Sequence, residues 1–350
     1  MKRATRLLWL AAKVLIGAII SIEVLSFLAI TITNFILYGH PREGPRSVYD
    51  PYTLFLQSAG PRTTMHNSVS LDPVKNRTLW LFGGSTMRGE NFDNDKTIPS
   101  YLAEYLNSGT SGLHFTVKNY GMNAFNSLLE TKYLQKLLAE GEKPPHMIVF
   151  YDAANDAKYF AEHRNAHGHY GFRRTSALIE SYYRSWFGLL KPLNAAIYAS
   201  FAKELYDKIH QLAVPLEPDS PELRRLVDLA TKRYDYVDKV AECMGADFIL
   251  FWQPTLWVEE CPEIPADVKE KEKSALLDSD KYAAMRVNFA LPYLMLADRL
   301  KHKPYFVSLQ DALCTRKVPA YMADGVHTTE QGNKILAMRM GRIIEKRMEK

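Results

Sequence analysis

The chain has 350 residues, of which 47% are hydrophobic and 24% are charged, and this composition excludes an intrinsically disordered or collagen-like protein. Its three cysteines are too few for a small disulfide scaffold. The net charge of +5 falls to +2 once residues 1–38 are set aside, and no basic stripe follows, so we expect no nucleic-acid partner.

Residues 1–38 are expected to form a cytoplasmic N-terminus and a membrane anchor. The apolar segment Val14–Leu37 has 24 residues. As a helix it would rise about 36 Å, enough to cross a bilayer core of roughly 30 Å. Glu23 is its one carboxylic acid, and such a residue is costly in a bilayer. A buried core helix and a cleavable signal peptide are the alternatives.

The basic residues before this segment predict its orientation. Four lysines and arginines precede it, which keeps the N-terminus in the cytoplasm and exports everything after Tyr38. The body is then periplasmic or extracellular, where disulfides form. One bridge could form among Cys243, Cys261 and Cys314, and the sequence does not specify which pair, if any, forms it.

After an irregular, proline-rich approach segment over residues 39–77, short apolar runs alternate with amphipathic helices. The runs are continuous rather than alternating, which is typical of a parallel sheet covered by helices on both faces. The expected strands are residues 78–82, 114–120, 147–151, 248–252 and 305–308, and the expected helices are residues 98–106, 128–139 and 330–346.

One connection is far longer than the others. About 95 residues separate the third expected strand from the fourth, whereas an ordinary crossover needs about a dozen. This stretch is helical in pattern and rich in aromatic residues. It predicts a helical cap over residues 158–245, inserted into an α/β body made of residues 78–157 and 246–350.

Open α/β sheets bind ligands beyond the carboxyl ends of their strands, and polar residues gather at those positions. Ser85 lies in a glycine-flanked turn and could act as a nucleophile if a base activates it. His327 is the candidate base, and Asp324 is the candidate acid that orients its imidazole. The N–H groups of Ser85 and Gly121 and the amide of Asn155 could form an oxyanion hole.

Each of these segments has an ordinary alternative when it is taken alone. Gly83-Gly84-Ser85-Thr86 is compatible with a plain turn or with a phosphate loop that lacks the P-loop lysine. Asp324 and His327 are compatible with a helix cap and a surface histidine, and Asn155-Asp156 with a loop cap. Their order and their common placement at strand ends favour one acyl-transfer site.

These segments resemble the sequence blocks of the SGNH hydrolases, also called GDSL esterases and lipases. The matching stretches are Phe82-Gly83-Gly84-Ser85-Thr86, Asn119-Tyr120-Gly121, Asn155-Asp156 and Asp324-Gly325-Val326-His327. The resemblance covers residues 78–157 and 246–345. It implies a flavodoxin-like three-layer α/β/α sandwich, with Ser85 as nucleophile, His327 as base and Asp324 as its orienting acid. It also implies that Ser85, Gly121 and Asn155 form the oxyanion hole.

The chain departs from the family pattern at three places. The first block reads Gly-Ser-Thr where Gly-Asp-Ser is usual. Ala153 stands where the third block usually has a glycine, and Ala124 stands where a further glycine is common in the second. None of these changes removes a catalytic functional group.

The resemblance implies a serine esterase that needs no metal and no organic cofactor. By family analogy the substrate is an O-acetyl group on a cell-envelope glycan, with a lipid ester or a thioester as alternatives. The same residues would serve an acyltransferase that moves the acyl group to a sugar hydroxyl. A non-catalytic envelope scaffold is the third hypothesis.

Two further clusters are better explained without a metal. His163, His167 and His169 have a spacing that allows metal binding, but no cysteine or carboxylate pair nearby completes a site. Asp93 and Asp95 fit the acidic start of the helix that follows them, whereas a calcium site needs more oxygen ligands.

Overall fold

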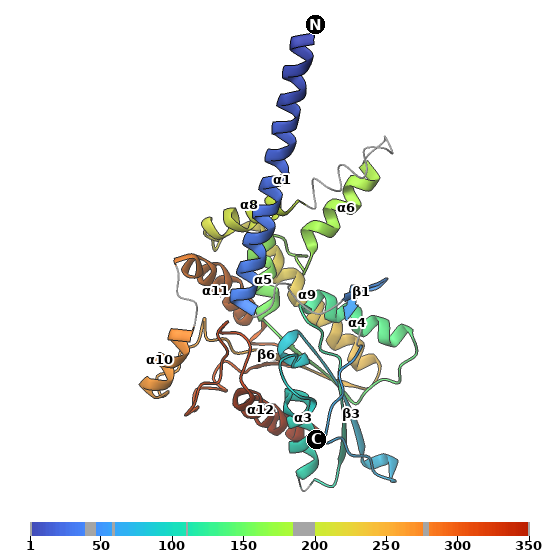
Figure 1. Ribbon diagram of the computed structural model, residues 1–350. Helices are drawn as coiled ribbons and strands as arrows, with labels where there is room; N and C mark the ends of the chain where they lie inside the picture. The colour runs from blue at the N-terminus through green and yellow to red at the C-terminus, as the bar shows by residue number, and fades with distance from the viewer. Residues whose placement is uncertain are drawn as a thin grey trace. The chain divides into compact units, whose positions relative to one another are not determined.

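The computed structural model describes residues 2–38, 47–57, 60–109, 111–184, 200–275 and 280–348 (Figure 1). The chain divides into two compact units. The first comprises Met1–Glu43 and Gly171–Val214, and the second comprises Gly44–Tyr170 and Pro215–Lys350.

The first unit contains three described helices, α1 (Lys2–Tyr38), α6 (Phe172–Arg184) and α8 (Phe201–Ala213). Within α1, the stretch Thr5–Thr33 has a mean hydropathy of 2.4, and its 29 residues are long enough to cross a membrane. This stretch begins earlier than the expected segment Val14–Leu37. A signal sequence near the N-terminus can also be apolar and helical over such a length.

The second unit is built on a five-stranded parallel sheet with the order β4-β3-β5-β6-β7. The strands are β3 (Asn76–Gly83), β4 (His114–Asn119), β5 (Met147–Asp152), β6 (Asp247–Trp252) and β7 (Phe306–Ser308). Counted along the chain within this sheet, the order is 2-1-3-4-5, which is the flavodoxin-like arrangement. The expected parallel α/β sheet is therefore confirmed.

Helices cover both faces of this sheet. Successive residues of a strand point to opposite sides, so neighbouring residues of β3 enter different core clusters. Leu79 and Leu81 share one core cluster with residues of α3 (Ile98–Ser108) and α12 (Glu330–Met348). Trp80 and Phe82 belong to the other core cluster. That cluster also includes residues of α4 (Ser127–Ala139), α5 (Ala154–His163), α9 (Pro221–Cys243) and α11 (Asp280–Leu300). The result is a three-layer α/β/α sandwich.

The approach segment contains an antiparallel hairpin, β1 (Ser47–Asp50) and β2 (Leu54–Gln57), that the sequence did not predict. Asp50 closes its turn, since Oδ1 accepts hydrogen bonds from the Thr53 N–H at 2.8 Å and from the Tyr52 N–H at 3.0 Å. Strands of four residues are too short to give a clear alternating pattern. Residues 39–46 lie outside the described residues.

The long connection expected as a cap, residues 158–245, is divided between the two units. Residues 171–214 belong to the first unit, and residues 185–199 lie outside the described part of the chain. Helix α9 instead belongs to the layer that covers the sheet, where Leu223, Leu226 and Tyr234 are buried. The apolar side of α9 thus packs into the core of the sandwich.

A disulfide joins Cys261 to Cys314, with 5.0 Å between the Cα atoms, and Cys243 is free and exposed. The pairing that the sequence left open is thereby assigned. The bridge lies beside Ile264 and Val268 in a small apolar cluster of its own.

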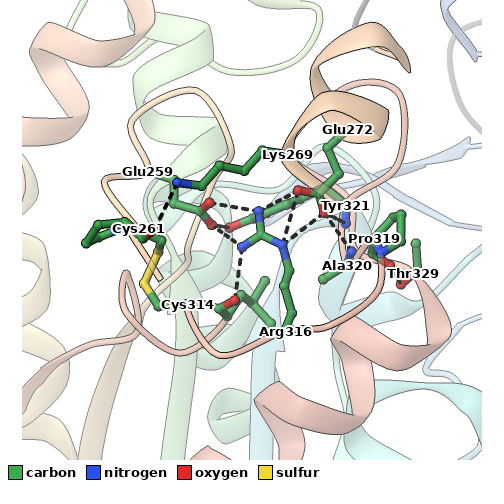
Figure 2. Close-up of polar contacts among 12 residues, drawn as sticks. Glu259, Cys261, Lys269, Glu272, Cys314, Arg316, Pro319, Ala320, Tyr321 and Thr329 are labelled. Atoms are coloured by element: carbon green, nitrogen blue, oxygen red, sulfur yellow. Dashed lines mark hydrogen bonds and ion pairs between the residues drawn. A yellow bond between two sulfur atoms is a disulfide. The ribbon is translucent and has the colours of Figure 1, made fainter. Parts of the chain in front are cut away.

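Next to this bridge, a buried ion cluster ties three segments together (Figure 2). The Arg316 guanidinium donates two hydrogen bonds to Glu259, both at 2.8 Å, and its Nε lies 3.0 Å from Glu272 Oε1. Glu272, on α10 (Ala266–Ala275), also accepts the Ala320 N–H at 2.7 Å. Because Arg316 and Glu272 are buried, each charge depends on its partner for stabilisation.

We expect Glu272→Gln to lower the free energy of unfolding by about 3–5 kcal/mol, because it removes one of the two negative charges around a buried cation. Asp267→Asn, on the same helix, is the matched control, since its ion pair with Lys271 is exposed and is worth about 1 kcal/mol or less. Denaturant unfolding measures both variants. Equal losses in the two would contradict the role of the buried cluster.

Candidate active site

Ser85 is the first residue of the short helix α2 (Ser85–Arg88), directly after the carboxyl end of β3. The turn before it requires glycine, because a Cβ at Gly83 would lie 2.6 Å from Met87 Cβ and one at Gly84 would collide with the amide nitrogen of Asn155. Among the described residues, the Ser85 N–H has no acceptor, as is usual in the first turn of a helix.

The second part of the site is the turn that carries Asp324 and His327 ahead of α12. Asp324 Oδ1 accepts the N–H groups of Val326 and His327, both at 2.9 Å, and Oδ2 is hydrogen-bonded to His327 Nδ1. The same carboxylate therefore folds the turn and orients the imidazole. The turn is tied to the preceding segment by the Met322 N–H, which donates to the His327 carbonyl at 2.8 Å.

These two parts meet. Ser85 Oγ lies 2.6 Å from His327 Nε2. Because His327 Nδ1 faces a carboxylate, we assign the ring proton to Nδ1, which leaves Nε2 as the acceptor for the Ser85 hydroxyl. Serine, imidazole and carboxylate thus form a continuous chain of hydrogen bonds.

The environment of Asp324 keeps this carboxylate ionised. Burial by itself raises the pKa of Asp324, but the hydrogen bond and charge of His327, together with the two backbone donors, outweigh it and lower the pKa to about 2. The carboxylate is therefore charged at neutral pH. It can hold the Nδ1 proton and stabilise an imidazolium ion.

Gln253 is a positioning residue that the sequence did not reveal. It follows the carboxyl end of β6, and its Nε2 donates to Thr86 Oγ1 at 3.2 Å and to the Val326 carbonyl at 3.1 Å. It therefore links the residue after Ser85 to the residue before His327. The Tyr293 hydroxyl donates to the Gln253 carbonyl at 2.6 Å and fixes its place. In the sequence, the feature that could have identified Gln253 was its position one residue beyond the end of an expected strand.

The three expected oxyanion donors differ in availability. The Ser85 N–H has no acceptor among the described residues. Asn155 Nδ2 lies beside Gly84 and donates one of its two hydrogens to the Phe125 carbonyl at 2.6 Å. The Gly121 N–H, in contrast, donates to Asn119 Oδ1 at 2.9 Å. Two donors are therefore ready, and the third is occupied.

The two alanines that stand where the resemblance led us to expect glycine adopt backbone conformations that favour glycine. Ala153 has φ +142° and Ala124 has φ +64°. Ala153 immediately precedes α5, the helix that carries Asn155. A non-glycine residue in such a conformation stores strain of about 1–3 kcal/mol, held by the surrounding structure. The departures in sequence thus coincide with strained backbone on both sides of the site.

A buried acidic group underlies the Asn155 turn. Glu130, Asp152 and Asp156 are all buried, and Asp152 accepts a hydrogen bond from the Tyr234 hydroxyl at 3.0 Å. Burial, with the negative charge of Asp156, raises the pKa of Asp152 to about 8. Burial, with the charge of Asp152, raises the pKa of Glu130 well above its usual range. The native state therefore holds protons here at neutral pH.

No group of histidines, cysteines or acids that could hold a metal is present in the part of the chain that the structure describes. His163 Nε2 lies 3.1 Å from the His169 carbonyl oxygen, and His169 Nδ1 lies 2.7 Å from that of Tyr170. Two of the three histidines whose spacing would allow metal binding therefore make local backbone contacts.

No protein-family model matches the chain, and no curated protein sequence matches it significantly. Similar solved structures include an aryl esterase of M. smegmatis (17% identity, TM-score 0.37, covering 77% of this chain and 99% of that one). They also include an acetyl xylan esterase (10%, 0.42, 76% and 99%). A third is a member of the lipolytic G-D-S-L family from Veillonella parvula (11%, 0.36, 76% and 97%). At these identities and scores the likeness assigns no activity to the chain.

We expect Ala153→Gly to raise the free energy of unfolding by about 0.5 kcal/mol, since relief of about 2 kcal/mol of strain exceeds the loss of about 0.8 kcal/mol from one buried methyl group together with about 0.7 kcal/mol of glycine chain entropy. Ala154→Gly, in the first turn of α5, is the control and should lower it by about 0.5–1 kcal/mol. Thermal or urea unfolding measures both. A loss of stability in Ala153→Gly would show that the position is not strained.

The buried acids predict a pH dependence of stability. Because the pKa of Asp152 is raised from 3.8 to about 8, the native state holds a proton that the unfolded state has lost between these values. Stability should therefore fall as pH rises through this window, by up to about 1.4 kcal/mol per pH unit for one proton. Asp152→Asn should flatten the profile, whereas Asp219→Asn, at an exposed side chain, should not. Parallel profiles for Asp152→Asn and the unmodified chain would contradict the shift.

Proposed function

We propose that this chain is a membrane-anchored serine esterase of the SGNH type. The observation that carries the proposal is the 2.6 Å hydrogen bond between Ser85 Oγ and His327 Nε2, with Asp324 on the other ring nitrogen. Thr86 is a less suitable nucleophile, since it is buried and its hydroxyl accepts the Gln253 amide. Ser85 is therefore the group placed to attack a substrate.

In the first half of the reaction, Ser85 Oγ attacks the ester carbonyl carbon while His327 Nε2 takes the hydroxyl proton. The carbonyl oxygen becomes an oxyanion, which the Ser85 N–H and Asn155 Nδ2 stabilise. Gly121 contributes only after its N–H leaves Asn119. The imidazolium then protonates the leaving alcohol, the C–O bond breaks, and an acyl-enzyme remains on Ser85.

In the second half, water attacks the acyl carbonyl and His327 accepts its proton. The tetrahedral intermediate collapses, the carboxylic acid leaves, and Ser85 regains its hydrogen. Asp324 stays ionised throughout and stabilises the imidazolium in both halves. These steps use only groups of this chain and water.

We propose that the substrate is an acylated polymer, with an O-acetyl group on a cell-envelope glycan as the favoured case. The side chains of His327 and Asp324 are 26% and 29% exposed, so the site is half-buried and partly open to solvent. An open site admits an ester carried on a long chain, which an enclosed cavity would exclude.

We further propose that α1 crosses the membrane with its N-terminus in the cytoplasm, and that the second unit is exported. The lysines and arginines before the apolar stretch support this orientation. The Cys261–Cys314 disulfide is compatible with an oxidising compartment outside the cytoplasm.

The proposal predicts that Ser85→Ala lowers the hydrolysis of p-nitrophenyl acetate by roughly a thousandfold or more, because the acyl-enzyme can no longer form. Asp324→Asn should cause a loss of similar order, since an amide at this position favours the wrong imidazole tautomer. Ser308→Ala, at the exposed end of β7, is the control and should leave the rate unchanged.

Unchanged turnover in Ser85→Ala would remove the nucleophile assignment. A fluorophosphonate probe that forms no adduct with Ser85 in the folded chain would favour a non-catalytic scaffold. If an added glycan acceptor receives the acyl group faster than water does, the enzyme is an acyltransferase with the same residues.

A further inference from the structure

The carboxylate of Glu23 has a structural partner within the first unit. The Phe201 N–H donates to Glu23 Oε2 at 2.9 Å, and the Ser200 hydroxyl donates to Oε1. The Phe27 and Phe201 rings meet edge to face 5.1 Å apart, four residues further along α1. Glu23 therefore caps the N-terminus of α8 from inside the apolar stretch of α1.

This contact fixes the depth at which α8 can lie. Lys203 and Glu204 occupy the first turn of α8, and their charges exclude a position at the centre of a bilayer. Glu23 must then lie near the outer boundary of the hydrocarbon. The preceding residues, Thr5–Ile22, would rise about 27 Å as a helix, which matches the shorter membrane-spanning helices.

Helices α6 and α8 of the first unit expose apolar and aromatic side chains. On α6, Ile179 and Tyr183 are 50% and 80% exposed and, being four residues apart, share one face of the helix, next to Leu178, which is 41% exposed. On α8, Ile209 is 59% exposed. Together, α6 and α8 contain five lysines and arginines against three acids, and five aromatic residues. This combination is typical of helices that lie in a membrane interface.

From these observations we infer that α6 and α8 lie in the outer-leaflet interface of the membrane that α1 crosses, with Glu23 capping α8 at that boundary. The occupant of their exposed apolar face is the lipid surface, and the excess of basic residues favours anionic headgroups. The inference rests on the proposed membrane span and is independent of the proposed esterase reaction. It also explains why a carboxylate is retained in α1.

The test uses the full chain in nanodiscs of zwitterionic and anionic phospholipid. In a Cys243→Ser background that keeps the Cys261–Cys314 disulfide, nitroxide labels are placed through Tyr183→Cys and Ile209→Cys. Ile16→Cys in α1 is the lipid control, and Val74→Cys, at a residue 78% exposed in the second unit, is the water control. Power saturation compares collisions with oxygen and with a nickel chelate.

We expect the oxygen-to-nickel ratio at residues 183 and 209 to exceed that at residue 74 by about threefold or more. Ratios equal to that at residue 74, with residue 16 in lipid, would overturn the inference and leave the anchor intact. A water-like ratio at residue 16 as well would overturn both the inference and the anchor. Hydrolysis of p-nitrophenyl acetate by the labelled chains reports on the esterase proposal separately.

The cap itself is tested by hydrogen exchange at the Phe201 amide. Glu23→Leu should raise its exchange rate by about fivefold, because loss of a cap is worth about 1 kcal/mol, whereas Glu23→Gln keeps a carbonyl acceptor and should change it little. Equal exchange in the unmodified chain and in Glu23→Leu would show that Glu23 does not hold α8.

Discussion

The hydrogen bond between Ser85 and His327 joins residues 242 positions apart, and the rest of the second unit determines whether it forms. Ser85 is placed by the carboxyl end of β3, and Asn155 by the turn after β5, the neighbouring strand. A parallel sheet brings these ends to one edge. His327 reaches the same edge from a turn outside the sheet, so its position depends on that turn.

Hydrogen bonds outside the parallel sheet fix the His327 turn, which the antiparallel bridge between Tyr321 and Thr328 closes. Asp324 folds it from within, and Gln253 ties it to the segment that carries Ser85. The Arg316 cluster holds the chain upstream through the Ala320 N–H (Figure 2). Such contacts are short-ranged and directional, so they position an imidazole within tenths of an ångström, which apolar packing alone does not specify.

The Asn155 side of the site is built differently. Strained backbone at Ala153 and a protonated acidic group beneath it are both destabilising on their own, and the buried core around β5 sustains them. Functional sites often carry such unfavourable elements because they aim a side chain in a direction that relaxed backbone does not provide. Here they aim the Asn155 amide towards the turn that begins α2.

The sequence alone determined the five sheet strands and the glycine turn before Ser85, because continuous burial and tight turns leave local patterns. It also proposed the pairing of Asp324 with His327, because the two residues are close along the chain. It did not determine Gln253, the Cys261–Cys314 pair, the Arg316 cluster or the contact of Glu23 with α8. Each of these joins residues far apart in sequence, so only the tertiary packing brings the donor and acceptor together.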